Sequence, residues 1–313
     1  MKRSFIPALL LALLATAPLA GCDKINVLKA RKAFKDANVL YQRGDYREAA
    51  AKYEEALRLD PNLVVAYFYL ANSYDNLYKP TRKGEPENDR YLDKAIEYYR
   101  IAAERETEPE RKELALKFLV AAFGPDRKAD PEQAEKYVRQ MIQMEPQEPT
   151  NYFALAKIYE DVGRYEDAEQ ALLKAKDARP KDPQVYLQLA GFYNRQGEFE
   201  KTIQWLQERA ALEPNNPEAY YLISTYYWEK AHRDFRLTEA QKRDYIMKGI
   251  EAADKAIALN PNYMEALTYK NLLLRLQANV EKDPAKQKAL IAEADRLRNR
   301  AIELQKKRTA GIG

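Results

Sequence analysis

The sequence of 313 residues contains one cysteine, one histidine and only ten glycines. A single cysteine and a single histidine exclude a Cys/His zinc site, an iron–sulfur cluster and an intramolecular disulfide. Few glycines leave little material for loops that cradle phosphate. The net charge of +4, from 52 basic and 48 acidic side chains, argues against a dedicated DNA or RNA binder, which carries a strong basic excess. We therefore expect no metal and no nucleic-acid partner.

Tyrosine, in contrast, occurs 23 times, and 32% of the residues are charged. A composition rich in tyrosine and charge and poor in glycine is typical of helices packed on helices rather than of sheets. At about 100–200 residues per domain, the chain has room for two ordinary domains or one elongated array.

The first residues have the layout of a secretory signal peptide. Lys2 and Arg3 precede an apolar run of 17 residues, from Phe5 to Gly21, that ends on small side chains. The run is shorter than the roughly 20 residues that a membrane-spanning helix needs. Pro7 and Pro18 weaken a spanning interpretation further.

The only cysteine follows this run directly, in Leu19-Ala20-Gly21-Cys22. This tetrapeptide resembles the lipobox of bacterial lipoproteins. The resemblance implies a cleaved signal peptide at 1–21, a diacylated Cys22, a lipidated tether at 22–29 and a bacterial cell-envelope location. Asp23 resembles an inner-membrane retention signal and gives a bias toward that membrane, but the choice between inner and outer membrane stays open. The alternative is an ordinary signal peptide with a buried cysteine nearby.

A period of 34 residues runs through the middle of the chain. Five positions recur in three copies: Tyr152, Tyr186 and Tyr220; Leu155, Leu189 and Ile223; Ala156, Ala190 and Ser224; Tyr159, Tyr193 and Tyr227; Pro146, Pro180 and Pro214. Within a copy the apolar residues have helical spacing in two segments, so each copy predicts two helices. Gly163 suits the turn between the two helices, and Pro180 ends the second one. Thr238 and Gln241 have capping-box spacing.

These aromatic, small, Gly and Pro positions resemble the tetratricopeptide repeat (TPR), most completely in 149–182. The resemblance implies an all-α fold, a right-handed superhelical solenoid of helix–turn–helix repeats. About seven units cover 30–308: 30–63, 64–109, 110–148, 149–182, 183–216, 217–263 and 264–308, followed by a tail at 309–313. The third and seventh units keep only part of the pattern, so six units with a degenerate terminal pair is an equally acceptable count.

The sequence offers little for catalysis. His232, after Trp228 and Lys230, is interpreted as a surface or capping histidine. Paired carboxylates alternate with Lys and Arg on helical faces, as expected of solvated surface. There is no phosphate loop and no nucleophile motif, so we predict no enzyme activity and no cofactor. The basic last helix could contact anionic lipid or cell-wall polymer, although a solvated end cap is the preferred interpretation.

The TPR resemblance implies that the first helix of each repeat lines a concave groove that binds a peptide or protein. The candidate groove residues are Phe34, Asn38 and Tyr41; Phe68, Asn72 and Asp75; Phe153, Lys157 and Glu160; Leu187 and Asn194; and Tyr221, Thr225 and Trp228. Aromatic rings supply buried area and asparagine can bond to peptide backbone. The alternative for any one ring is packing beneath a neighbouring repeat. A carboxylate clamp is not reproduced, because Phe34 and Tyr69 stand where it needs Lys and Asn.

Two functions from different classes are compatible with these residues. The leading hypothesis is a lipid-anchored envelope scaffold, attached to the membrane through Cys22, that binds partner proteins and supports the assembly or localisation of an envelope complex. Similar family members serve in pilus secretin assembly, outer-membrane protein insertion and docking of cell-wall enzymes. The alternative is a receptor for a solute or a cell-wall glycan, with Tyr and Trp as stacking platforms.

Overall fold

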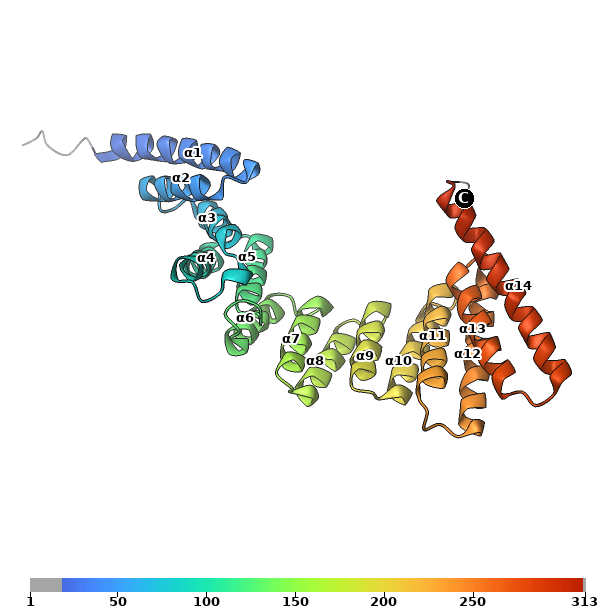
Figure 1. Cartoon of the computed structure of the whole chain (residues 1–313). Helices are drawn as coiled ribbons and strands as arrows, with labels where there is room; N and C mark the ends of the chain where they lie inside the picture. The colour runs from blue at the N-terminus through green and yellow to red at the C-terminus, as the bar shows by residue number, and fades with distance from the viewer. Residues whose placement is uncertain (1–18, 312–313) are drawn as a thin grey trace, which may run out of the picture. The chain divides into compact units, whose positions relative to one another are not determined.

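The computed structural model describes residues 19–311, and their side chains from Lys24 onward (Figure 1). This part of the chain contains 14 α-helices, one short 3-10 helix and no strand. The helices are α1 Leu19–Arg43, α2 Tyr46–Leu59, α3 Val64–Leu77, η1 Pro80–Arg82, α4 Pro86–Arg105, α5 Pro109–Ala122, α6 Pro131–Met144, α7 Pro149–Asp161, α8 Tyr165–Ala178, α9 Pro183–Arg195, α10 Phe199–Leu212, α11 Pro217–Arg233, α12 Glu239–Leu259, α13 Met264–Val280 and α14 Pro284–Thr309.

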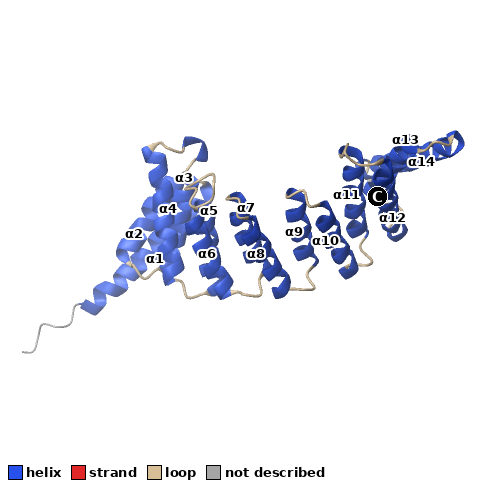
Figure 2. Cartoon of the chain, turned by 90° about the horizontal axis from the view of Figure 1, so that it is seen from below, coloured by secondary structure: helices blue, strands red, loops and turns tan. Residues whose placement is uncertain are grey.

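The chain divides into two compact units, residues 1–145 and 146–313. In the first unit α1 to α6 form three helix pairs, and in the second α7 to α14 form four. Figure 2 shows the two helices of a pair lying side by side. Each of the seven predicted repeats therefore holds one helix pair. The segment 22–29, predicted as a tether, belongs to α1, and it contains no Pro or Gly that would end a helix.

The helix ends follow from local sequence. Gly44, Gly163 and Gly197 have φ between 76° and 83° in the turns between first and second helices, a conformation that costs glycine little. The capping box predicted at Thr238 and Gln241 is confirmed at the start of α12. The extra residues of the seventh repeat lengthen its helices, since α13 has 17 residues and α14 has 26, whereas the connection between them is short.

The repeating tyrosine and proline positions form one recurring hydrogen bond, with the tyrosine hydroxyl as donor and the proline carbonyl as acceptor. In the second unit the Tyr186 hydroxyl donates to the Pro180 carbonyl at 2.7 Å, and Tyr152 donates to Pro146 at 2.9 Å. The bond ties the first helix of a repeat to the end of the preceding second helix. Pro180 follows the C-cap residue Arg179, beyond the end of α8, so its carbonyl has no helical N–H donor and accepts the hydroxyl instead.

Small side chains lie where helices cross. Ala156, Ala168 and Ala190 are at most 2% exposed, so neighbouring helices approach closely at these points. Ala190 belongs to one apolar cluster with Ile203 and Ile223 of the next helices, which joins two repeats of the second unit. No helix among residues 19–311 combines the length and the apolar character needed to cross a bilayer. Of the predicted signal peptide, 1–21, residues 1–18 lie outside the described residues.

Candidate partner-binding site

The aromatic candidates of the first unit lie in the seams between repeats. The Phe34 ring of α1 is 5.6 Å from Tyr53 of α2 and 5.9 Å from Tyr69 of α3, between ring centroids. Phe68 of α3 is 5.5 Å from Phe118 of α5. Both rings are half-buried. They therefore contribute to repeat packing and present only part of their area to a partner.

The polar candidates of the same unit are engaged with neighbouring side chains. Asn38 accepts a hydrogen bond from the Tyr53 hydroxyl at 2.6 Å, and burial raises the pKa of that tyrosine. Asn72, 7% exposed, accepts a hydrogen bond from Tyr41. Asp75 forms an ion pair with Arg127. A peptide bound here would have to exchange these partners or use the exposed edges of the rings.

In the second unit, two charged candidates form ion pairs, and two others expose part or most of their side chain to solvent. Glu160 of α7 binds the Arg195 guanidinium of α9 through two bonds of 3.0 and 2.8 Å, which crosses from one repeat to the next. Lys157 pairs with Asp161 one turn away. Asn194 is exposed, and Phe153 is half-buried. Leu187 packs against the apolar cluster that its own repeat shares with the next one.

Two of the last three candidates, Tyr221 and Trp228, belong to an aromatic patch on the first helices α11 and α13. We call it the α11–α13 patch; it consists of Tyr221, Trp228, His232 and Tyr269. Tyr269 lies between Tyr221 and Trp228, with ring centroids 5.6 and 5.5 Å away. His232 stacks on Trp228 at 5.0 Å and 11°. The three larger rings are half-buried and His232 is exposed. Thr225 donates its hydroxyl to the Tyr221 carbonyl at 3.1 Å.

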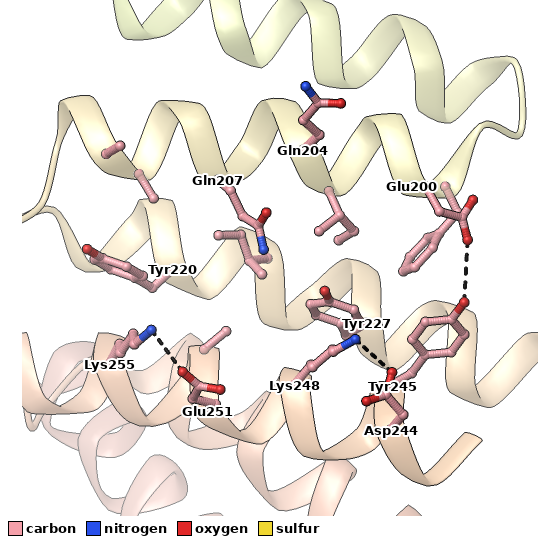
Figure 3. A pocket seen from close by; sticks show the side chains of 16 residues that line it. Glu200, Gln204, Gln207, Tyr220, Tyr227, Asp244, Tyr245, Lys248, Glu251 and Lys255 are labelled. Atoms are coloured by element: carbon pink, nitrogen blue, oxygen red, sulfur yellow. Dashed lines mark hydrogen bonds and ion pairs between the residues drawn. The ribbon is translucent and has the colours of Figure 1, made fainter. Parts of the chain in front are cut away.

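A cleft of about 790 Å³ lies on the second helices of the same unit and was not among the sequence predictions (Figure 3). It runs between α10 and α12, with Tyr220 and Tyr227 of α11 between them. Its charged groups on α12 pair along that helix, as Lys248 does with Asp244 at 2.7 Å, whereas Glu200 of α10 accepts a hydrogen bond from Tyr245 of α12 at 3.4 Å. The amide of Gln207 has no hydrogen-bond partner within the described residues and is available to a ligand.

Gly249 is the sequence signal that could have pointed to this cleft. A Cβ at this position would lie 2.9 Å from a Leu273 methyl group and 3.0 Å from the Tyr227 Cβ. Glycine inside a helix therefore lets α12 pack closely on α11 and α13. From the sequence, this segment is recognised only by the capping box at Thr238 and Gln241, which does not indicate how closely the helix packs.

The described residues show no ready-made metal site. Across 19–311, no group of three His, Cys, Asp or Glu side chains is placed to hold a metal ion. His232 faces Trp228 rather than a nucleophile. The candidate residues form a surface of half-exposed rings, exposed amides and charged groups, on helices that repeat packing holds in place.

Comparison with known families matches these features. A family model described as "TPR repeat" matches residues 37–77, and one described as "Tetratricopeptide repeat" matches 127–187 and 163–226. The chain contains tetratricopeptide repeats. The C-terminal part of a TPR repeat-containing protein from Cytophaga hutchinsonii superimposes with a TM-score of 0.53 and 18% sequence identity, over 87% of this chain and 98% of that one. The predicted all-α TPR solenoid fold is confirmed.

Two other relatives are more distant or shorter. The structure of YrrB, described as a TPR protein with an unusual peptide-binding site, is 17% identical, with a TM-score of 0.41 over 65% of this chain and 96% of that one. A putative pentatricopeptide repeat-containing protein of Arabidopsis thaliana is 47% identical over 47 residues, which are 15% of this chain. The match spans only 11% of the length of that curated relative.

Proposed function

We propose that the protein is a lipid-anchored scaffold of a bacterial cell envelope, which binds protein partners through the first helices of its repeats. TPR proteins are generally protein-interaction scaffolds and typically not enzymes. The observation that carries the proposal is the α11–α13 patch, where Tyr221, Trp228 and Tyr269 expose part of their rings on adjacent first helices. Aromatic anchors of this kind supply most of the energy at protein interfaces.

The anchor and the envelope location rest on the sequence. The Lys2 and Arg3 start, the apolar run and the lipobox-like tetrapeptide ending in Cys22 support acylation. Two or three acyl chains would hold the protein on the membrane, since one chain alone binds only marginally. The partner would then meet the repeats close to that membrane. Asp23 favours the inner membrane.

Site-specific photo-cross-linking in cells tests the partner site. A photoreactive amino acid replaces Trp228 in the patch, and a control replaces Met247 on α12, which is 62% exposed and belongs to the same repeat. We expect a protein adduct from position 228 that position 247 does not give. Equal adducts from both positions, or none from 228, would contradict the proposed site.

The same patch allows a direct test of the receptor alternative. Partly exposed rings such as those of Trp228 and Tyr269, which meet edge to face, can also serve as stacking platforms for sugars. Titration calorimetry with soluble cell-wall fragments should show no heat for a protein scaffold. Saturable heat that is lost in Trp228→Ala would replace the scaffold hypothesis with the glycan-receptor hypothesis.

A further inference from the structure

The first helix of the array has one face that no other helix covers. The opposite face of α1 carries Ala30, Ala33 and Ala37, which are at most 5% exposed and face α2. The uncovered residues follow at helical spacing, in one ridge: Ile25, Leu28, Lys32, Lys35 and Val39. We call this ridge the outer face of α1. Its three apolar side chains are 54%, 66% and 42% exposed.

The outer face lies in a strongly basic environment. Residues 24–43 contain six basic side chains and one acidic side chain, Asp36, a net charge of +5. All six basic side chains are exposed, and none of them has an ion-pair partner within residues 24–311. Elsewhere, exposed basic residues commonly pair within their helix. In α14, for example, Arg298, Arg300 and Lys307 each bind an acidic neighbour.

This combination of apolar and unpaired basic side chains disfavours packing against another helix like the helices inside the array. The seams inside this protein bury alanines and aromatic rings, as at Phe34 and Tyr69. A helix from a second copy placed on the outer face would have to cover Lys32 and Lys35, which have no acidic partner on α1, and burying them is unfavourable unless that helix supplies carboxylates. An anionic bilayer, in contrast, accepts both kinds of side chain. Apolar groups enter the acyl boundary, and lysines extend along it to the phosphates.

We infer that the outer face of α1 binds the surface of an anionic phospholipid bilayer and thereby fixes how the first repeat meets the membrane. Cys22 precedes Ile25 by three residues in the same helix, so an acyl anchor and the outer face would act on one surface. The inference extends the lipid anchor of the proposed function. It requires no acyl chain, however, so each can be tested without the other.

Vesicle flotation tests the inference on the full chain carrying Cys22→Ser, which cannot be acylated. The readout is the difference in binding between vesicles of phosphatidylglycerol mixed with phosphatidylcholine and vesicles of phosphatidylcholine alone. The N-terminal segment, with Lys2 and Arg3, is the same in every variant, so a change in this difference between variants reports on α1. We expect a preference for the anionic vesicles that weakens with added salt.

Substitutions then locate the contact. Lys32→Glu with Lys35→Glu should reduce affinity for anionic vesicles by at least about tenfold. Leu28→Ser with Val39→Ser should reduce it as well, without changing the charge. The matched control is Lys288→Glu with Arg296→Glu on α14, which makes the same charge change at exposed side chains. It should leave binding near the parent value. Circular dichroism verifies that helix content is equal in all variants.

Three results would overturn the inference. Equal binding to both vesicle types would remove the charge-dependent contact. An equal loss in the α14 control would make the effect one of net charge. Self-association in solution that disappears with Lys32→Glu and Lys35→Glu would assign the outer face to a second copy. None of these results bears on cross-linking from Trp228, so a failure here leaves the scaffold proposal separately testable.

Discussion

At the scale of single residues, a hydroxyl and a carbonyl explain why tyrosine recurs. Tyr186 is 6% exposed, and its hydroxyl donates to the Pro180 carbonyl at 2.7 Å. Phenylalanine would fill the same space but leave that carbonyl without its donor. The bond is partly buried, so removing its donor costs about what one intramolecular hydrogen bond contributes. The recurring residue is therefore tyrosine rather than phenylalanine because it connects consecutive repeats.

We predict that Tyr186→Phe lowers the free energy of unfolding by about 1 kcal/mol. Urea unfolding followed by circular dichroism measures the change. The matched control is Tyr165→Phe, because Tyr165 is 45% exposed and its hydroxyl has no hydrogen-bond partner in the described structure. It should leave stability close to that of the parent. Equal effects in the two variants would mean that the hydrogen bond to Pro180 contributes nothing specific.

The alanines at helix crossings give the largest expected single-residue effect. Ala190 is fully buried in a cluster with Ile203 and Ile223. Ala190→Asp places a carboxylate there without a partner, so we expect a loss of several kcal/mol in the free energy of unfolding. Thermal unfolding measures it, with Ala292→Asp on the exposed side of α14 as the control. An unchanged midpoint for Ala190→Asp would contradict the observed helix pairing.

At the scale of elements, sequence periodicity predicts a helix better than it predicts what the helix contacts. The 34-residue spacing predicts both helices of a repeat, because each contact between repeats needs Tyr, Ala and Pro at the same positions. The contacts of Tyr221 and Trp228 depend on Tyr269, which belongs to the next repeat and follows no strict register. Likewise, the cleft between α10 and α12 depends on how closely Gly249 lets α12 approach.

Loops show the same limit. Nothing in the sequence indicates that Ala129 adopts φ of 55° in the connection between α5 and α6, since that conformation is unusual for a residue with a Cβ. Asp45 and Gly44, in contrast, stand where a glycine turn is expected, and Gly44 adopts φ of 83°. Local turn chemistry is therefore predictable where glycine supplies it. Around Ala129, backbone hydrogen bonds such as the one from its N–H to the Gly124 carbonyl at 2.9 Å hold the loop, and no residue type signals that conformation.

The α11–α13 patch allows stability and binding to be separated on one element. Tyr221→Ala with Trp228→Ala removes two half-buried rings that touch Tyr269. We expect capture of the partner cross-linked at position 228 to weaken by about 2 kcal/mol or more, with helix content near that of the parent. Met247→Ala on α12 serves as the control and should change neither property. A strongly destabilised double variant that binds fully when folded would assign these rings to the core.

At the scale of the whole molecule, burial acts on tyrosines in both units. Burial is the largest cause of a raised pKa for fourteen tyrosines: Tyr41, Tyr53, Tyr74, Tyr78, Tyr91, Tyr98, Tyr99, Tyr186, Tyr193, Tyr226, Tyr227, Tyr245, Tyr263 and Tyr269. In the unfolded chain these phenols titrate near pH 10, whereas in the folded chain they keep their protons to higher pH.

The direction of the pH dependence follows from this difference. Below about pH 10 both states hold the phenolic protons, so this contribution to stability is fully present. As pH rises further, the unfolded chain releases protons that the folded chain retains, and stability falls. We therefore predict loss of helix content above about pH 10, together with a cooperative rise in tyrosinate absorbance. Tyrosinate formation that is complete near pH 10 with intact helices would contradict the prediction.

The proposed lipid anchor of the whole molecule depends on the sulfur atom of Cys22. Cys22 is the only cysteine, so Cys22→Ser removes the only thiol that could carry a thioether-linked glyceride. In bacteria that acylate lipoproteins, we expect the parent to incorporate a fatty-acid analogue and the variant to incorporate none. The variant should remain uncleaved, or leave the membrane at high salt, which weakens the charge-dependent contact of α1. A second variant, Cys22→Ser with Ala258→Cys, restores a thiol at an exposed position outside the lipobox-like tetrapeptide. It should also stay unlabelled, because acylation requires the sequence around the cysteine as well as the thiol. Label in either variant at the level of the parent would disprove the anchor at Cys22.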